Sequence, residues 1–266
     1  MPQRDLEIHY EPNRRLTQEG GWTGYNCGYA EARGRSFAEH QRSLVWRLLG
    51  DVPIDGGSTV LDIGCGIGGP TEWVRERYRP RRVIGLEYCG SSVLAAARRC
   101  RDSAEWPVFL RGDAHHLPFA DASVDVILCL ESALHYADKD AFLAGCARVL
   151  APGGSLYLGD ITARCRWIFA PLAILNRLPG QFNSYVRLWS TREYREAFAR
   201  RGLTLVRYEN ASRPVADSLA DGLTEIKRMG QRVLHEIRGR FAFLAALQYL
   251  LKNRHLGYDL FTLRRV

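Results

Sequence analysis

The chain has 266 residues, of which 46% are hydrophobic and 25% are charged, and its formal net charge is +8. This length predicts one large α/β domain or one domain with an insertion, and the composition is typical of soluble proteins. No apolar stretch approaches the ~20 residues that span a bilayer, and the polar start is unlike a signal peptide. Because the seven cysteines contain no C-x-x-C pair, we expect a cytoplasmic protein with reduced thiols and no membrane partner.

The positive charge raises nucleic acid as a partner, because basic surface patches bind phosphates. The arginines are instead spread through predicted helices such as 72–82 and 192–201, and they do not alternate with aromatic residues in a compact patch. We therefore expect an arginine-rich solvated surface and no nucleic-acid partner.

The first 32 residues are polar and aromatic, and they show little periodicity. Their glycines and asparagine, as in the stretch 22–29, predict a loop rather than a helix or strand. A helix is expected next, because Phe37, Leu44 and Leu48 recur at helical spacing before the turn-forming residues 51–57.

The stretch 58–75 contains the most informative local motif of the chain. An apolar run predicts a buried strand over 59–63, and closely spaced glycines then turn the chain into a helix over 71–78. Such glycines let the backbone approach a ligand that a Cβ would block, and the amides at the helix start favour polar or anionic groups. The letters G-C-G-I-G-G satisfy the dinucleotide fingerprint G-x-G-x-x-G, but this match alone is weakly specific.

Strands and helices alternate from this motif to residue 160. Strands are predicted at 59–63, 82–87, 107–111, 124–130 and 155–160, with helices at 71–78, 91–101 and 139–150 between them. This alternation predicts a parallel sheet with helices on both faces, whose ligand site lies beyond the carboxyl ends of the strands. Five acidic residues lie at such ends, which indicates a single site: Asp62, Glu87, Asp113, Glu131 and Asp160.

The alternation stops after Asp160. Residues 161–190 are apolar and aromatic with several prolines and glycines, and they leave a strand end that faces the predicted site. We expect this insertion to form a cap over the acceptor, and a helical pair that only adds core or a dimer face is the alternative. Beyond it we expect a helix over 191–201, a strand over 203–209, helices over 216–251 with a break near Gly239, and a strand over 257–263.

Five motifs follow one another in a characteristic order across about residues 40–160. They are D-x-G-x-G-x-G beginning at Asp62, the acid Glu87 after the second strand, Asp113-Ala114, the strand 124–130 followed by E-S-A-L-H, and V-L-A-P-G-G at 149–154. This set resembles the small-molecule (natural-product type) branch of the class I S-adenosylmethionine-dependent methyltransferase family, and it favours that family over a dehydrogenase.

The resemblance implies an α/β, Rossmann-like class I methyltransferase fold. Its sheet has seven mostly parallel strands, helices on both faces and an antiparallel C-terminal strand, with the apolar cap at about 161–190 as an insertion. Residues 33–266 are expected to form this methyltransferase domain. Residues 1–32 are expected to form a lid over the cofactor and the acceptor, and the alternative is that Tyr25 and Tyr29 only pack the N-terminus onto the domain.

The resemblance also implies S-adenosylmethionine as the cofactor. Asp62 and the glycine loop are expected to receive its ammonium group, and Glu87 to accept hydrogen bonds from the ribose diol. An N-cap role for Asp113 and a surface role for Glu87 are the structural alternatives. The residues expected to bind the cofactor are Tyr25, Asp62, Gly64, Cys65, Gly66, Gly68, Glu87, Tyr88, Asp113, Ala114 and Leu130.

The sulfonium is already an activated methyl donor, so the enzyme needs positioning and, for a hydroxyl acceptor, a base. His135 follows the fourth strand, and in similar O-methyltransferases a histidine near this place removes the acceptor proton. Glu131 and Asp160 are second candidates at neighbouring strand ends. No metal site is expected, because ligand spacings such as H-E-x-x-H are absent. The acceptor pocket is expected to include Trp22, Tyr29, Trp167, Phe169, Tyr185 and Trp189.

The leading functional prediction is O-methylation of a small, bulky organic acceptor in specialised (natural-product) metabolism. One alternative is C-methylation of an isoprenoid or polyketide carbon, with Glu131 as base and cap arginines such as Arg164, Arg166 and Arg177 near an anionic substrate group. Another alternative is a cyclase that binds the cofactor without consuming it. The expected partners are the small-molecule acceptor and, as an open alternative, a second copy of the chain in a homodimer.

Overall fold

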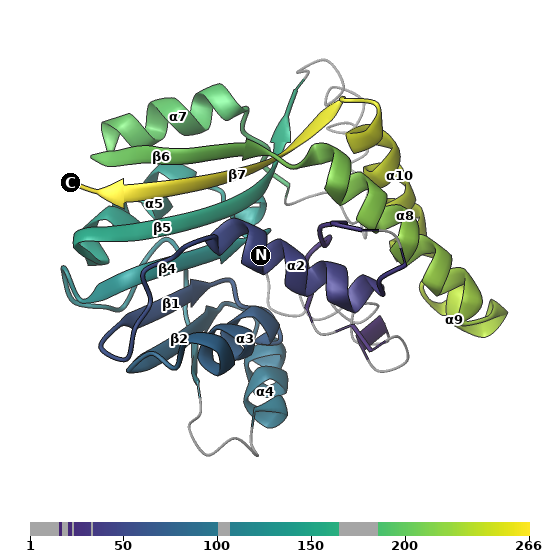
Figure 1. Ribbon diagram of the computed structural model, residues 1–266, viewed down its shortest axis with the longest axis horizontal. Coiled ribbons are helices and arrows are strands. Elements are labelled where there is room, and N and C mark those ends of the chain that lie inside the picture. Colours follow the sequence, from purple (N-terminus) through teal and green to yellow (C-terminus); the bar gives the residue numbers. More distant parts are fainter. Residues whose placement is uncertain (1–15, 18–20, 23, 33, 101–106, 165–185) are drawn as a thin grey trace.

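The computed structural model describes residues 16–17, 21–22, 24–32, 34–100, 107–164 and 186–266. Its centre is a seven-stranded sheet in the order β3-β2-β1-β4-β5-β7-β6 (Figure 1). β1 to β5 pair in parallel, and β7 runs antiparallel between β5 and β6. The predicted α/β fold with its antiparallel C-terminal strand is therefore confirmed. The strands are β1 (Thr59–Ile63), β2 (Arg82–Glu87), β3 (Val108–Arg111), β4 (Val124–Leu130), β5 (Leu150–Ala163), β6 (Leu203–Asn210) and β7 (Leu256–Arg265).

The central strands β1 and β4 are mostly apolar because both faces of the sheet are covered. Every residue of β1 is buried, and so is every residue of β4 except Asp125. Near-continuous apolar runs are the pattern expected of parallel strands between two helical layers. The buried Asp259 of β7 is compensated by hydrogen bonds from Thr162 at 2.9 Å and Arg164 at 2.6 Å. Arg164 therefore stabilises the sheet by pairing with the buried carboxylate of Asp259.

Helices cover the two faces of the sheet and form two apolar clusters with it. One cluster contains residues of α2, α3, α8, α9 and α10, and the other contains residues of α5 and α7. α4 contacts the edge strands β2 and β3. The bounds are α2 (Phe37–Leu49), α3 (Gly69–Tyr78), α4 (Gly90–Arg99), α5 (Lys139–Val149), α7 (Thr191–Arg200), α8 (Ser212–Arg228), α9 (Gln231–Glu236) and α10 (Arg238–Lys252), with a short 3-10 turn η1 (Ala133–His135) after β4.

The last three helices, α8, α9 and α10, lie beside the carboxyl ends of the parallel strands (Figure 1). α8 and α10 pack against each other, which brings α10 back toward the sheet before β7 begins. The break expected near Gly239 lies at Ile237, which separates α9 from α10, and Gly239 itself belongs to α10. A second break, which we did not expect, lies between α8 and α9 at Gly230, whose φ of +95° suits glycine.

The two segments expected to cover the site are described only in part. The cap was expected to begin at Ile161, but β5 continues to Ala163 and pairs with β7 up to that residue. Of the cap, residues 165–185 lie outside the described residues. Of the expected N-terminal lid, residues 24–32 are described without a break. Within the described residues, no helix combines the length and apolarity needed to cross a bilayer.

Candidate functional site

A cavity of about 360 Å³ lies at the carboxyl ends of β1, β2 and β4, where the sheet topology predicts a ligand. Its walls come from the glycine loop, the ends of β2 and β4, the N-terminal segment and α10. The structure brings ten of the eleven expected cofactor residues to this wall, together with the two candidate bases Glu131 and His135. The ten are Tyr25, Asp62, Gly64, Cys65, Gly66, Glu87, Tyr88, Asp113, Ala114 and Leu130.

The glycine loop turns through left-handed backbone conformations that glycine adopts without strain. The φ of Gly64 is +73°, and a Cβ at this position would overlap the side chain of Ser132. Gly68 is the exception among the expected cofactor residues, because it does not line the cavity. Its φ is +80°, and a Cβ there would lie 2.7 Å from the Phe109 ring, so Gly68 serves the packing of α3 onto β3 and α4.

Glu87 joins the end of β2 to the glycine loop. One carboxylate oxygen accepts the Gly66 N–H at 3.0 Å, and the other accepts the Cys89 N–H at 2.8 Å. Burial raises the pKa of Glu87, and these backbone hydrogen bonds oppose that shift. Glu87 thus presents an oriented carboxylate to the cavity, and its remaining lone pairs suit the two hydroxyls of a ribose.

Asp62 lies deeper in the cavity wall, with only 3% of its surface exposed. The Thr71 hydroxyl donates to its carboxylate at 2.6 Å. Burial raises the pKa of Asp62 to about 7, with a smaller contribution from the charge of Glu87, while the Thr71 hydrogen bond opposes the shift. A buried acid of this kind is ready to accept a cationic partner, because a positive charge would offset the cost of ionising it.

This raised pKa predicts a pH dependence of cofactor binding. Between about pH 4 and pH 7 the ligand-free folded protein keeps a proton on Asp62 that the unfolded chain has lost, so this residue's stabilising contribution falls as pH rises. If the ammonium group of the expected cofactor binds beside Asp62, its charge favours the carboxylate and expels that proton. Affinity for S-adenosylhomocysteine should therefore rise with pH below about 7, by at most about tenfold per pH unit.

The measurement is calorimetric titration of the wild type and Asp62→Asn between about pH 6 and pH 8. The variant has no titrating group at this position, so its affinity should be weaker and should vary less with pH. Equal pH dependence in the two proteins would contradict the assignment and would place the titrating group elsewhere.

Asp113 and its neighbours form the part of the cavity beyond β3. Asp113 accepts the backbone N–H of His115 at 2.9 Å and the His115 ring nitrogen at 2.7 Å. Burial raises the pKa of Asp113, but the hydrogen bonds from His115 and the His115 charge outweigh burial, so the pKa lies below its ordinary value. Tyr88 is 44% exposed and lies at the rim. His115 also lines the cavity, and its pairing with Asp113 assigns it a structural role that the sequence did not predict.

Glu131 occupies the carboxyl end of β4 in an unusual conformation. Its φ is +52°, which is uncommon for a residue other than glycine, and such strained conformations are enriched at functional positions. One carboxylate oxygen accepts the Cys27 N–H and the Tyr258 hydroxyl, both at 2.7 Å, and the other is 3.0 Å from the Cys27 sulfur. Burial raises the pKa of Glu131, and all three hydrogen bonds oppose that shift.

Cys27 and Tyr258 were missed as site residues because their partner is remote in sequence. The segment that contains Cys27 is also fixed from other sides: Gln41 donates to the carbonyls of Gly24 and Asn26 at 2.8 and 2.9 Å, and Ser218 donates to that of Cys27 at 2.9 Å. Residues 24–28 are therefore anchored to the domain.

His135 ends the 3-10 turn η1 just after Glu131, and it lines the cavity. The turn is closed by a hydrogen bond from the His135 N–H to the Ser132 carbonyl at 3.0 Å. The third candidate base, Asp160, does not reach the cavity. It is fully buried, accepts the Tyr194 hydroxyl, and lies on the face of β5 that packs against α7. Side chains alternate along a strand, so the neighbouring Ile161 lines the cavity instead.

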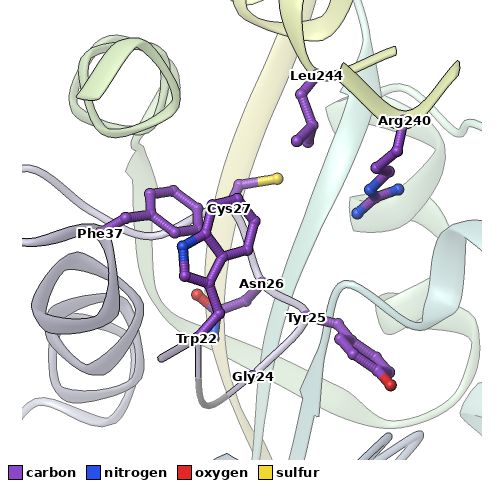
Figure 2. A pocket seen from close by; sticks show the side chains of 8 residues that line it. All are labelled: Trp22, Gly24, Tyr25, Asn26, Cys27, Phe37, Arg240 and Leu244. Atoms are coloured by element: carbon purple, nitrogen blue, oxygen red, sulfur yellow. The ribbon is translucent and has the colours of Figure 1, made fainter. Parts of the chain in front are cut away.

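Three of the expected acceptor-pocket residues lie elsewhere. Trp22 packs its ring 4.2 Å from that of Phe37 and closes a small hollow beside the main cavity (Figure 2). Tyr29 donates to Glu209 at 3.2 Å, and Trp189 packs 5.2 Å from Tyr194. These rings fix the N-terminal segment and α7 to the domain. The other three, Trp167, Phe169 and Tyr185, lie outside the described residues.

The apolar wall of the cavity comes from four other residues. Ile161 at the end of β5 and Val186 before α7 belong to the stretch expected to cover the acceptor, whereas Phe243 and Leu247 on α10 were not selected from the sequence. The helical spacing of Arg240, Phe243 and Leu247 was the available signal, because residues three and four apart share a helix face. Among the described residues, no group of three or more histidines, cysteines or acids could hold a metal ion.

Comparison with protein families matches a model described as "Methyltransferase domain" to residues 61–158. The chain is 33% identical over 165 residues to erythromycin 3''-O-methyltransferase of Saccharopolyspora erythraea, covering 60% of this chain and 53% of that protein. It is 37% identical over 135 residues to 27-O-demethylrifamycin SV methyltransferase of Amycolatopsis mediterranei, covering 50% and 49%. The chain therefore spans about half the length of these curated relatives.

Solved structures share the fold over nearly the whole chain. A mycolic acid cyclopropane synthase, CmaA1, complexed with SAH and CTAB, superposes with a TM-score of 0.85 at 18% identity, covering 99% of this chain and 98% of that one. The [4+2]-cyclase SpnF superposes with a TM-score of 0.81 at 20% identity, covering 99% and 96%. These neighbours differ in the reactions that their names state, so the likeness establishes the fold alone.

Proposed function

We propose that the chain, whose residues 61–158 match a methyltransferase domain, is a class I S-adenosylmethionine-dependent methyltransferase that methylates a hydroxyl oxygen of a small organic acceptor. The observation that carries the proposal is the arrangement of Glu87, Asp62 and the glycine loop around one cavity that continues into an apolar wall. A polar end for a nucleoside and an apolar end for a second molecule are what a two-substrate transfer requires.

The cavity fits S-adenosylmethionine in three places. Glu87 suits the ribose diol, Asp62 suits the ammonium group, and Ala114 beside Asp113 offers an apolar wall and an acceptor for adenine. Tyr25, which also lines the cavity, packs on the glycine loop: a Cβ on Gly66 would lie 3.1 Å from the Tyr25 ring, closer than ordinary contact. When bound, the cofactor supplies an activated methyl group.

The chain's own residues then position the acceptor and remove its proton. The hydroxyl must approach in line with the methyl group near the end of β4, where His135 lines the cavity. His135 is the proposed base. Both oxygens of Glu131 already accept hydrogen bonds, from Cys27 and Tyr258. This supports a positioning role for Glu131, with residues 24–28 as a fixed wall of the site rather than a mobile lid.

The proposal is tested by incubating the protein with S-adenosylmethionine and a panel of hydroxylated polyketide, macrolide and aromatic acceptors. S-adenosylhomocysteine should form in equal amount to a product that gains one methyl group. Carbon NMR of the product should show a methoxy carbon. A methyl group bonded to carbon would reject oxygen transfer, and product without S-adenosylhomocysteine would indicate a cyclase or another reaction that does not consume the cofactor.

A second candidate function, C-methylation, is favoured by one observation. Glu131 lines the cavity, and burial raises its pKa. A buried carboxylate with a raised pKa can accept the proton that carbon loses after methyl transfer. In this case Glu131 is the base, and His135 only lines the site.

A further inference from the structure

A buried lysine contacts the turn that carries His135. Lys139 is the first residue of α5, and only 1% of its surface is exposed. Lysines are almost never fully buried unless a partner compensates the charge. The Lys139 ammonium donates a hydrogen bond to the backbone carbonyl of Ala133, the first residue of η1. Burial lowers the pKa of Lys139, and the negative charge of Asp160 opposes that shift.

Asp160 supplies the opposite charge from the neighbouring strand. It is fully buried near the end of β5, where it accepts the Tyr194 hydroxyl. Burial raises the pKa of Asp160, the charge of Lys139 is the largest contribution that opposes the shift, and the backbone N–H of Leu134 in η1 opposes it too. Lys139 and Asp160, called the charge pair below, therefore favour each other's charged form, and both act on the backbone of η1.

The turn η1 is short and depends on its surroundings. It is a three-residue 3-10 helix, a geometry whose hydrogen bonds are poorer than those of an α-helix. Two hydrogen bonds of 3.0 Å close it, from the His135 N–H to the Ser132 carbonyl and from the Tyr136 N–H to the Ala133 carbonyl. His135 and Tyr136 line the cavity, whereas neither member of the charge pair does. The charge pair thus acts on the site through the turn and not by touching a ligand.

Stability alone is a weak explanation for the charge pair. Moving two charges out of water costs free energy that their attraction repays only when the geometry is good, and apolar side chains of similar volume often stabilise a fold equally well. A satisfied buried polar network can instead fix the positions of the groups that it binds. Here the bound group is the backbone of η1, which ends at His135.

We propose that Lys139, with Asp160 as its counter-charge, is a positioning residue that fixes η1 so that the His135 imidazole reaches the acceptor hydroxyl. This inference rests on the proposed function, in which His135 is the base. It also gives Asp160 a role in the reaction, although the Asp160 side chain does not reach the cavity.

The test replaces both charges together. Lys139→Met alone leaves Asp160 without its counter-charge and is expected to destabilise the fold, so the informative protein is the double variant Lys139→Met with Asp160→Asn. Thermal melting should show that it is folded, and its Kd for S-adenosylhomocysteine should match the wild type. Its kcat for the best acceptor of the panel should fall by about 10–100-fold, because a misplacement of about 1 Å can cost that much.

Lys252→Met is the matched control, because Lys252 is exposed at the end of α10 and loses the same charge. It should keep wild-type turnover. The decisive comparison adds the two substitutions of the double variant to His135→Ala, where they should lower kcat no further, because residues that act as a unit are not additive. An equal loss in both backgrounds would overturn the inference, as would loss of S-adenosylhomocysteine binding in the double variant.

Hydrogen exchange tests the same turn without an acceptor, on protein saturated with S-adenosylhomocysteine. The amides of His135 and Tyr136 should exchange at least about tenfold faster in the double variant, because the turn loses a hydrogen bond from a charged group. The amides of β1 should keep their wild-type rates. Unchanged protection at both turn amides would overturn the inference.

Two outcomes separate this inference from the function on which it rests. Near-normal turnover in His135→Ala rejects His135 as the base, and absence of S-adenosylhomocysteine binding to the wild type rejects the proposed function. A large loss of turnover in His135→Ala, together with wild-type turnover in the double variant, rejects only the positioning role of Lys139.

Discussion

Glu87→Ala is expected to weaken the binding of S-adenosylhomocysteine by about 1.5–3 kcal/mol, which corresponds to roughly 10- to 150-fold in Kd. The carboxylate is expected to accept hydrogen bonds from both ribose hydroxyls, and hydrogen bonds to a charged group are the strongest of their kind. Glu87 also accepts the Gly66 N–H, so its loss frees the glycine loop that faces the ligand. Calorimetric titration measures the effect.

Two further variants separate ligand contact from damage to the fold. Glu87→Gln keeps the shape of the side chain but removes its charge, so its affinity should fall between those of the wild type and Glu87→Ala. Glu76→Ala removes a carboxylate that is exposed on α3, and it should bind like the wild type. Unchanged affinity in a folded Glu87→Ala protein would show that the ribose is held elsewhere.

His135→Ala is expected to lower turnover by about 10²–10⁴ while leaving the affinity for S-adenosylhomocysteine intact. A positioned base contributes most of its effect in the transition state, so kcat should fall and cofactor binding should not. In the wild type the rate should rise with pH while His135 loses its proton, because only the neutral imidazole accepts one. In His135→Ala this rise should disappear.

The variant should be measured beside Glu131→Gln and His116→Ala with one acceptor. His116 is an exposed histidine outside the cavity lining, so its loss should leave turnover unchanged. Near-normal turnover in His135→Ala, with a collapse in Glu131→Gln, would reject the oxygen-transfer assignment and favour carbon methylation with Glu131 as base. Activity retained in both would mean that positioning alone carries the reaction.

The sheet could be predicted because its signals are local. Apolar runs that alternate with helical patterns marked the first five strands, two later apolar runs marked the others, and Thr59–Ile63, Arg82–Glu87 and Val124–Leu130 have the predicted bounds. The cofactor end of the cavity could be predicted for a related reason. Parallel strands bring their carboxyl ends to one edge, so residues that directly follow a strand, such as Glu87 and Asp113, were expected to meet there.

The acceptor side could not be predicted in the same way, because it depends on contacts between remote segments. Cys27 and Tyr258 both bind Glu131, although each lies more than 100 residues from it in the sequence. Trp22 and Trp189 were expected in the pocket because of their size and position, but large aromatic rings are as often used to pack a segment onto a domain. Asp160 follows the strand-end pattern, but the alternation of side chains along β5 turns it to the opposite face.

The most direct test of the central claim is a pair of calorimetric titrations of the wild-type protein, one with S-adenosylhomocysteine and one with NAD. The account predicts saturable binding of S-adenosylhomocysteine with a micromolar Kd, about −8 kcal/mol, and no binding of NAD. The Gly-rich loop and Glu87 are common to both classes of nucleotide fold, so the result is not decided by fold alone. Binding of NAD without binding of S-adenosylhomocysteine would contradict the assignment to the methyltransferases.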